Sequence, residues 1–254
     1  MVRLALLDPV FRHLNYHTSL VNSPPDSNKK KVLLIHCHPI PNSFSYAISK
    51  AVESGLRRAG HDIRIRRLYV ADKPEESYNS ANFEPALTTQ ERKSYHMPDM
   101  MSIRENDGIL AKDKGTNTAV KQAISDLRWC DSIVFVYPTW WFNFPAALKG
   151  FFDRVLLPGV AFRITTNTSE KTNTGLAPGL PNIKKVGVVT TFGATPLVVL
   201  YAGDNGRRFI SRGFRALCAP QCAMLWHGLH GMDHTTEAER AAFLKEFEDA
   251  YSTF

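Results

Sequence analysis

The sequence predicts an α/β fold with a doubly wound, five-stranded parallel sheet in the order 2-1-3-4-5. Strand-like apolar runs alternate with helical segments along most of the chain, as crossover connections between parallel strands require. The first run, 31–36, is continuously apolar, which is typical of a central strand buried on both faces. The second, 63–66, alternates Ile with Arg, which predicts an edge strand with one wet face.

The remaining elements follow in order. Residues 43–59 carry apolar side chains at helical spacing, and Gly60 supplies a left-handed cap at the end of that helix. Pro145 is expected at the first position of a helix, where a proline is tolerated. Thr236 and Glu239 form a capping box at the start of the last helix. The other predicted segments are helices over 120–128, 145–156 and 205–218, strands over 132–137, 185–191 and 223–229, and a polar loop over 165–182.

The domain organisation is expected to be simple. Residues 1–30 form a loosely ordered N-terminal extension, with a targeting peptide as the less favoured alternative. Residues 31–254 form one domain with an insertion at about 74–118, where Pro, Asn, Asp and Ser are frequent and strand periodicity is absent.

Composition excludes several classes of protein. No apolar run reaches the ~18 residues of a membrane span. The net charge of +7 suits anionic ligands, but the sequence has no dense basic stripe of the kind that binds nucleic acid. The four cysteines, Cys37, Cys130, Cys218 and Cys222, form no CxxC pair. They are expected to be reduced and buried, which favours a cytoplasmic protein. No cluster of His or Cys has metal-ligand spacing, and no metal is expected.

The loop after the first strand is a candidate phosphate site. A helix start offers free N–H groups and the positive end of a helix dipole, and Asn42, Ser43 and Ser45 add short polar side chains there. The loop lacks the glycines of a GxGxxG motif and the GK[ST] of a nucleotide triphosphatase. Helix capping by Ser43 explains the same residues equally well.

Two further loops complete the candidate site, because the switch point of this sheet order lies outside the carboxyl ends of the first and third strands. The third strand runs into Pro138-Thr139-Trp140-Trp141-Phe142, an aromatic cluster that suits a flat aromatic ligand. The fourth ends at Thr190-Thr191-Phe192-Gly193, where Gly193 permits a close approach of the backbone to a planar ring. Arg207 and Arg208, further along, either meet a pyridine nucleotide phosphate or are solvated, and the second interpretation is slightly favoured.

Taken in order, these loops resemble those of the flavodoxin-like NAD(P)H:quinone oxidoreductases, the DT-diaphorase family. The second loop and its helix, 137–154, carry the most specific likeness, and the resemblance covers about 31–250. It implies a flavodoxin-like domain with a bound flavin, FAD or alternatively FMN. The residues it implicates in binding the flavin are His38, Asn42, Ser43, Phe44, Ser45, Pro138, Thr139, Trp140, Trp141, Phe142, Thr190, Thr191, Phe192 and Gly193.

The resemblance implies an NAD(P)H dehydrogenase (quinone). It would transfer two electrons as hydride from NADPH or NADH to quinones by a ping-pong mechanism, as a homodimer. Two other classes stay open, a flavodoxin-type electron carrier and a flavin-binding regulatory subunit of a membrane transporter. The carriers are acidic and shorter, whereas this chain has a net charge of +7 and an insertion.

One departure concerns proton handling. Mammalian members have a Tyr and a His, six residues apart, after the third loop. The corresponding positions here are Val198 and Asp204. Tyr201 and Asp204 are the candidate catalytic replacements.

Overall fold

The structure is a computed structural model that describes residues 17–19, 28–69, 89, 118–164 and 176–254. Most of the expected N-terminal extension lies outside the described residues. So does the expected insertion at 74–118, apart from Thr89 and Thr118. None of the helices in the described ranges is both long and apolar enough to cross a membrane.

The central sheet has the predicted parallel core. Its order is β3-β2-β4-β7-β8, which is 2-1-3-4-5 when these strands are numbered along the chain. A short sixth strand, β1 (His17–Ser19), pairs antiparallel with the outer edge of β8, and the sequence did not predict it. The bounds of the parallel strands are β2 Lys31–His36, β3 Asp62–Arg67, β4 Ser132–Pro138, β7 Lys185–Thr191 and β8 Ala223–Leu229.

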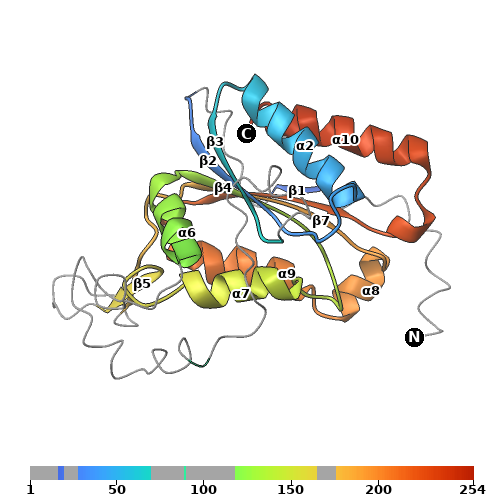
Figure 1. Ribbon diagram of the computed structural model, residues 1–254. Coiled ribbons are helices and arrows are strands. Elements are labelled where there is room, and N and C mark those ends of the chain that lie inside the picture. The colour runs from blue at the N-terminus through green and yellow to red at the C-terminus, as the bar shows by residue number, and fades with distance from the viewer. Residues whose placement is uncertain (1–16, 20–27, 70–88, 90–117, 165–175) are drawn as a thin grey trace.

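Helices cover both faces of the sheet (Figure 1). Helices α2 (Phe44–Arg58) and α10 (Glu237–Tyr251) lie side by side on one face. The opposite face carries α6 (Thr118–Trp129), α7 (Ala146–Val155) and α9 (Asn205–Arg208). The shorter elements are α8 (Pro196–Tyr201), η3 (Phe209–Phe214), η4 (Arg215–Leu217), η5 (Met232–His234) and the hairpin of β5 (Phe162–Ile164) with β6 (Leu176–Pro178).

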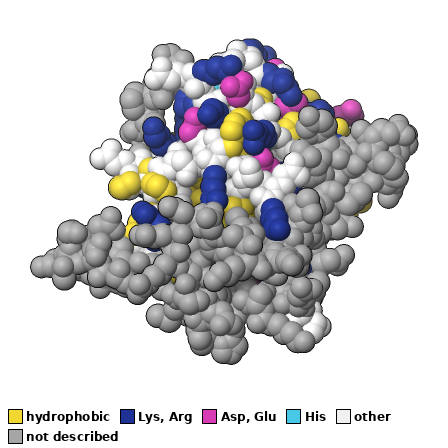
Figure 2. Space-filling view, turned by 60° about the vertical axis from the view of Figure 1, so that its left-hand side comes forward, with side chains coloured by type: hydrophobic (Ala, Val, Ile, Leu, Met, Phe, Trp, Pro, Cys, Tyr) yellow, Lys and Arg dark blue, Asp and Glu magenta, His cyan; other side chains and the backbone are white. Residues whose placement is uncertain are grey.

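The described surface is rich in paired charges. Figure 2 shows Lys and Arg side chains gathered on one face with Asp and Glu side chains among them. Two examples are Lys29 with Asp62 at 3.0 Å and Arg57 with Glu53 at 2.8 Å. Such exposed pairs each contribute little to stability.

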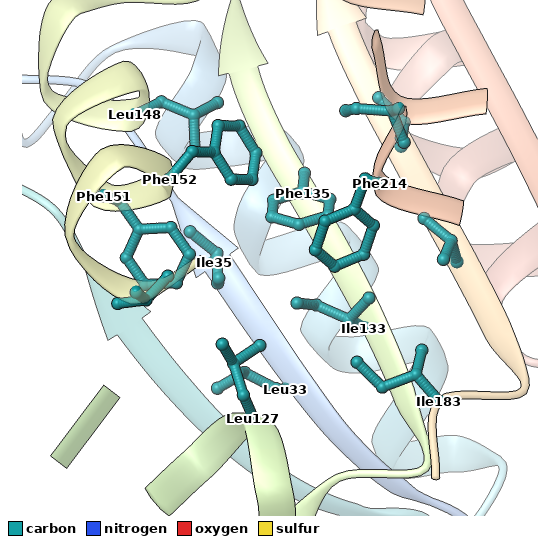
Figure 3. Packing of buried hydrophobic residues seen from close by; sticks show 14 of the residues in the cluster. Leu33, Ile35, Leu127, Ile133, Phe135, Leu148, Phe151, Phe152, Ile183 and Phe214 are labelled. Atoms are coloured by element: carbon teal, nitrogen blue, oxygen red, sulfur yellow. The ribbon is translucent and has the colours of Figure 1, made fainter. Parts of the chain in front are cut away.

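Apolar packing on the α7 face of the sheet holds the central strands in place (Figure 3). Leu33 and Ile35 of β2 and Ile133 and Phe135 of β4 are almost fully buried. Phe135 packs against Phe152 of α7 and Phe214 of η3, with ring centroids 5.5 and 5.4 Å away. Because helices cover both faces, these strands are apolar throughout rather than alternating.

The edge strand β3 differs from its prediction. It lies at the edge, as expected, but the face that carries its arginines is exposed at Arg64 and buried at Arg66. Arg66 is 1 % exposed and donates to Asp126 of α6 at 2.5 Å, while Arg64 lies over the Trp129 ring at 4.0 Å and pairs with Asp126 at 3.0 Å. The alternating pattern could not reveal that α6 brings a carboxylate to this face.

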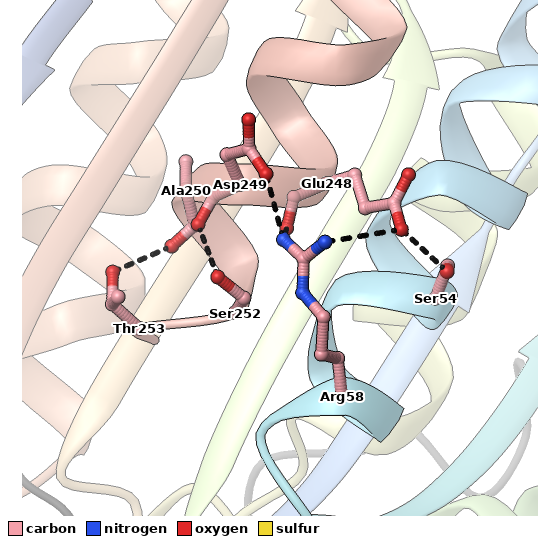
Figure 4. Close-up of polar contacts among 7 residues, drawn as sticks. All are labelled: Ser54, Arg58, Glu248, Asp249, Ala250, Ser252 and Thr253. Carbon is pink, nitrogen blue, oxygen red and sulfur yellow. Dashed lines mark hydrogen bonds and ion pairs between the residues drawn. The ribbon is translucent and has the colours of Figure 1, made fainter.

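Polar contacts between α2 and α10 fix the register of the two helices (Figure 4). Arg58 of α2 donates to Asp249 at 2.7 Å, and Ser54 donates to Glu248 at 2.9 Å. The predicted capping box of Thr236 and Glu239 is confirmed, as is the left-handed Gly60, whose φ is 77°.

Three boundaries were wrong or incomplete. Pro145 is the N-cap of α7, with ψ of 147°, rather than its first helical residue. The segment predicted as one helix over 205–218 passes from α9 through the π-helical η3 to the 3₁₀-helical η4. Strand β6 and helix α8 were not predicted, because each is too short to establish a period.

Candidate functional site

The carboxyl edge of the parallel sheet collects the candidate residues. The loops after β2, β4 and β7 all begin at this edge, because parallel strands end on the same side. Among the described residues, the large apolar side chains that are exposed all belong to these loops or to α8, and they are Ile40, Trp140, Trp141, Leu200 and Tyr201. Apolar surface gathered at one edge is typical of a binding site or an interface.

The loop after β2 presents the start of α2. The Ser43 side chain accepts from the Tyr46 amide at 3.2 Å and caps the helix, and no acidic residue lies in the first turn. The amides of Phe44 and Ser45 have no intrahelical acceptor at this position and carry the positive end of the helix dipole. The loop therefore suits an anionic group, in addition to the capping role of Ser43.

The buried His36 side chain contacts the start of α2. It is 2 % exposed, and its Nε2 lies 3.3 Å from the Ser45 hydroxyl. Burial, followed by the charges of Arg67 and His38, lowers the pKa of His36 to about 3. The ring is therefore neutral at physiological pH. The Ser45 side chain, expected to face a ligand, is itself buried and engaged with His36.

His38 lies nearer the surface and joins two loops. Its Nδ1 accepts from the Ile40 amide at 3.1 Å, which fixes the ring, and the ring lies 6.1 Å from Trp140, edge to face. Burial lowers the pKa of His38. The loop after β2 and the loop after β4 are thus in contact through His38 and Trp140.

The loop after β4 has an unusual backbone. Trp141 and Phe142 have φ of 51° and 59°, in the left-handed region that non-glycine residues rarely adopt. Such conformations cost of order 1–3 kcal/mol each and concentrate at functional sites. Trp141 is 95 % exposed, and its amide and that of Phe142 make no hydrogen bond within the described part of the chain. The loop therefore offers a large ring and two N–H donors to a ligand.

Other aromatic residues of the same segment are structural. Phe144 packs edge to face on Tyr137, Phe152 and Phe209, with centroids 5.3–5.4 Å apart. This contact anchors the loop to the core directly after the two left-handed residues. Trp140 and Asn143 also close the loop through two backbone hydrogen bonds of 3.0 Å.

The loop after β7 lies beside the loop after β4. The Thr139 and Thr190 hydroxyls are 2.9 Å apart, and the Thr139 amide donates to the Thr191 carbonyl at 2.7 Å. Phe192 is 4 % exposed and stacks on His230 with centroids 4.3 Å apart, so its ring belongs to the core. Gly193 is exposed, and a Cβ added there would lie 3.2 Å from the Asp233 carboxylate.

Three buried polar atoms at this edge lack a hydrogen bond of normal geometry: the Tyr137 hydroxyl, the Thr195 hydroxyl and His230 Nδ1. Tyr137 lies at the end of β4, Thr195 follows β7 and His230 follows β8, and these three strands are neighbours in the sheet. An unsatisfied buried polar group costs about 1–3 kcal/mol. Such groups fit a place where a ligand supplies polar partners, and no sequence pattern distinguishes these three residues.

Asp204 and Tyr201 occupy different environments. Tyr201 is 78 % exposed on α8, whereas Asp204 is half-buried at the start of α9 with φ of 45°. Burial raises the pKa of Asp204, against the opposing charges of Arg207 and Arg208. Burial, and then the charge of Asp204, raises the pKa of Tyr137.

Helix α9 packs closely on the strand end. A Cβ added to Gly206 would lie 3.2 Å from the Tyr137 hydroxyl, which is a tight contact that a small shift of that side chain would have to relieve. Asn205 reaches the loop after β4 by donating to the Phe142 carbonyl at 3.5 Å, a contact that the sequence did not predict. Asp204 is thereby held beside the end of β4.

The predicted site residues divide into two groups. The exposed or half-buried ones are His38, Asn42, Ser43, Phe44, Thr139, Trp140, Trp141, Phe142, Thr191, Gly193, Tyr201 and Asp204. The buried ones are Ser45, Pro138, Thr190 and Phe192. All except Tyr201 and Asp204 lie at or directly after a strand end, and these two lie in the segment that follows β7.

Comparison with known proteins agrees with this architecture. The family model described as having a flavodoxin-like fold matches residues 30–249. A ribosyldihydronicotinamide dehydrogenase [quinone] of Mus musculus is 31% identical over 136 residues, which is 53% of this chain and 54% of that protein. An uncharacterized NAD(P)H oxidoreductase of Haemophilus influenzae is 31% identical over 64% of each chain. The chain thus spans about half the length of the first of these relatives.

Solved structures share the fold at lower sequence identity. An NAD(P)H:quinone oxidoreductase of Methanothermobacter marburgensis superposes with a TM-score of 0.64 at 22% identity, covering 89% of this chain and 98% of that one. An FMN-dependent NADH-azoreductase of Bacillus anthracis in complex with FMN has a TM-score of 0.58 at 18% identity, covering 88% and 98%.

Proposed function

The chain belongs to the family of proteins with a flavodoxin-like fold, and from that premise we propose that it is a flavin-dependent NAD(P)H:quinone oxidoreductase. The observation that carries the proposal is the carboxyl edge itself. An exposed Trp141, two unused amides and the start of α2 lie on loops that leave neighbouring strands there. The names of the relatives, quinone and NAD(P)H dehydrogenases, support the same activity.

The residues present fit a flavin. The buried Thr195 hydroxyl, which has no hydrogen-bond partner within the described residues, supports a polar ligand at this edge, as do the Tyr137 hydroxyl and His230 Nδ1, whose contacts with Thr190 and the Ala194 backbone fall short of normal hydrogen-bond geometry. The amides at the start of α2, with Asn42 and Ser43, would hold the phosphate. Trp140, Trp141 and Phe142 would flank the ring system, and Thr139, Thr191 and Gly193 would border it. A flavin held there would accept hydride from a dihydronicotinamide and then pass it on to a quinone.

The chain's own groups then position the reactants and exchange protons. His38, held by the Ile40 amide, borders both loops and orients Trp140. Asp204, whose pKa is raised by burial, is our candidate for exchanging a proton with solvent, and Tyr201 is an exposed second candidate. Donor and acceptor would use the same site by turns, which is a ping-pong scheme, and parallel double-reciprocal plots test it.

Three narrower features belong to the proposal. The flavin is FAD or FMN, and the FMN named for the Bacillus anthracis relative supports FMN as a serious alternative to FAD. The exposed apolar side chains at the edge support a homodimer. The four buried, unpaired cysteines support a reducing, cytoplasmic setting.

Purified protein provides the test. We expect a yellow protein whose extracted flavin is identified by mass, and which oxidises NADPH when a quinone is added. A colourless protein that binds neither added FAD nor added FMN would overturn the proposal. Flavin binding without quinone-dependent turnover would instead favour an electron carrier or a flavin-binding regulatory subunit.

A further inference from the structure

The helical run that follows Asp204 carries an exposed line of arginines. Elements α9, η3 and η4 follow one another without a break from Asn205 to Leu217. Asn205, Arg208 and Arg212 are exposed. Arg208 follows Asn205 by three residues within α9, and Arg212 follows Arg208 by four residues, within the π-helical η3.

These two arginines differ from the exposed arginines that are paired, such as Arg58, and share their lack of an ion pair within the described residues with the exposed Arg128 and Arg163. Arg58 pairs with Asp249 at 2.7 Å, and Figure 2 shows basic and acidic side chains mixed on the face it draws. Neither Arg208 nor Arg212 forms an ion pair within the described part of the chain. Arg207, next to them, lies 3.9 Å from Asp204, and the charge of Arg208 also acts on that carboxylate.

The line starts at the candidate site and leads away from it. Asn205 donates to the Phe142 carbonyl, in the loop that carries Trp141. The Arg208 guanidinium folds back to the turn between α8 and α9, with Nη1 3.9 Å from the position of a Cβ on Gly203. Arg212 lies four residues further along the run, in η3.

We propose that Arg208 and Arg212 bind the phosphate groups of a pyridine dinucleotide and select phosphate-bearing hydride donors over phosphate-free ones. The inference rests on the proposed function of the same site. A dinucleotide whose nicotinamide lies beside Trp141 must extend its phosphates out of the site, and Asn205, Arg208 and Arg212 mark one path from that loop. Guanidinium groups suit this role because they donate two parallel hydrogen bonds to a phosphate and stay charged at all relevant pH values.

The experiment compares a hydride donor that carries phosphates with a donor that carries none. Values of kcat/KM are measured for NADPH and for dihydronicotinamide riboside, with one quinone, in the holoenzyme and in Arg208→Gln and Arg212→Gln. Arg163→Gln, at an exposed arginine on β5, is the matched control for the loss of one positive charge. Calorimetric binding of NADP⁺ to the same four proteins gives a readout that needs no turnover.

We expect each Arg208 or Arg212 substitution to lower kcat/KM for NADPH and affinity for NADP⁺ by about tenfold, as loss of a charge-assisted contact does. The riboside values should change less than twofold, and Arg163→Gln should change neither donor. Equal losses for both donors, or unchanged NADP⁺ affinity, would overturn the inference. A protein that lacks flavin but still loses NADP⁺ affinity on substitution would refute the proposed function while supporting the arginine site.

Discussion

At the scale of single residues, Trp141 separates a binding role from a packing role. Its side chain is 95 % exposed, so Trp141→Ala removes almost no core contact. We expect flavin affinity to fall by roughly 1 kcal/mol or more, while the free energy of unfolding of the flavin-free protein changes by less than about 1 kcal/mol.

Phe144→Ala is the matched control for Trp141→Ala. Phe144 lies in the same loop but packs against Tyr137, Phe152 and Phe209. Its truncation should cost about 3–5 kcal/mol of stability. Chemical denaturation and flavin titration on both variants check the pair. If Trp141→Ala strongly lowers the free energy of unfolding and leaves flavin affinity unchanged, Trp141 contributes to packing and not to flavin binding.

His36 gives the stability of the protein a defined pH dependence. Its pKa is lowered to about 3 in the folded protein, below the value of about 6.5 in an unfolded chain. The unfolded state therefore binds a proton first as the pH falls, and stability drops between about pH 6.5 and 3. We expect His36→Gln to make this slope shallower by at most about 1.4 kcal/mol per pH unit.

The window from pH 6.5 to 5 is the informative one for His36, because few carboxylates titrate there. Denaturation at several pH values in this window measures the slope. His230, whose pKa is lowered to about 4 by burial and then by Arg207, keeps a residual slope in the variant. Identical slopes in the two proteins would mean that His36 titrates normally in the fold.

At the scale of elements, the contact between β3 and α6 depends on a buried charge pair. Arg66 is 1 % exposed and pairs with Asp126. Asp126→Ala should destabilise the protein by about 3–5 kcal/mol, because it removes a partner of a buried guanidinium. In Arg66→Met/Asp126→Leu much of that loss should be recovered, since no charge is then left buried. Urea denaturation of the single and double variants checks this, and equal losses in both would contradict it.

The same elements indicate what local sequence can predict. The bounds of β2, β7 and β8 match the prediction because long apolar runs between polar ends define buried strands unambiguously. The environment of Arg66 was missed because it depends on α6, more than fifty residues away. Likewise, the left-handed backbone at Trp141 and Phe142 has no local signal, since neither residue is a Gly or an Asn.

At the scale of the whole molecule, the exposed apolar edge predicts self-association. Ile40, Trp140, Trp141, Leu200 and Tyr201 are exposed together at the carboxyl edge, which is more apolar surface than a monomer needs there. We expect light scattering at micromolar concentration to give about twice the chain mass of 28.5 kDa. Leu200→Asp should shift the protein toward monomer. A wild-type monomer with full activity would contradict the homodimer.

The sheet order and its switch point could be predicted because they follow from alternation of elements along the whole chain. The loops that meet at the edge followed from that order, and so did most of the candidate residues. The contributions of Asn205, Thr195 and His230 could not be predicted, because they depend on how α8, α9 and the end of β8 pack above the strands. The order of elements along the chain predicts the strand order, but the hydrogen bonding of polar atoms in the connecting loops and helices depends on tertiary packing.

The wide spacing of the edge residues along the chain has a consequence for the lifetime of the protein. The residues of the candidate site are spread along the chain from His38 to His230, so the site exists only when the whole chain has folded. A molecule that binds only the folded state stabilises it against unfolding, and the free energy of unfolding rises by about 2.7 kcal/mol at a ligand concentration of a hundred times Kd. If the proposed flavin is that molecule, proteases that act on opened chains would remove the protein more slowly when this vitamin-derived cofactor is plentiful. Nutritional supply would in this way set how much of the protein a cell keeps.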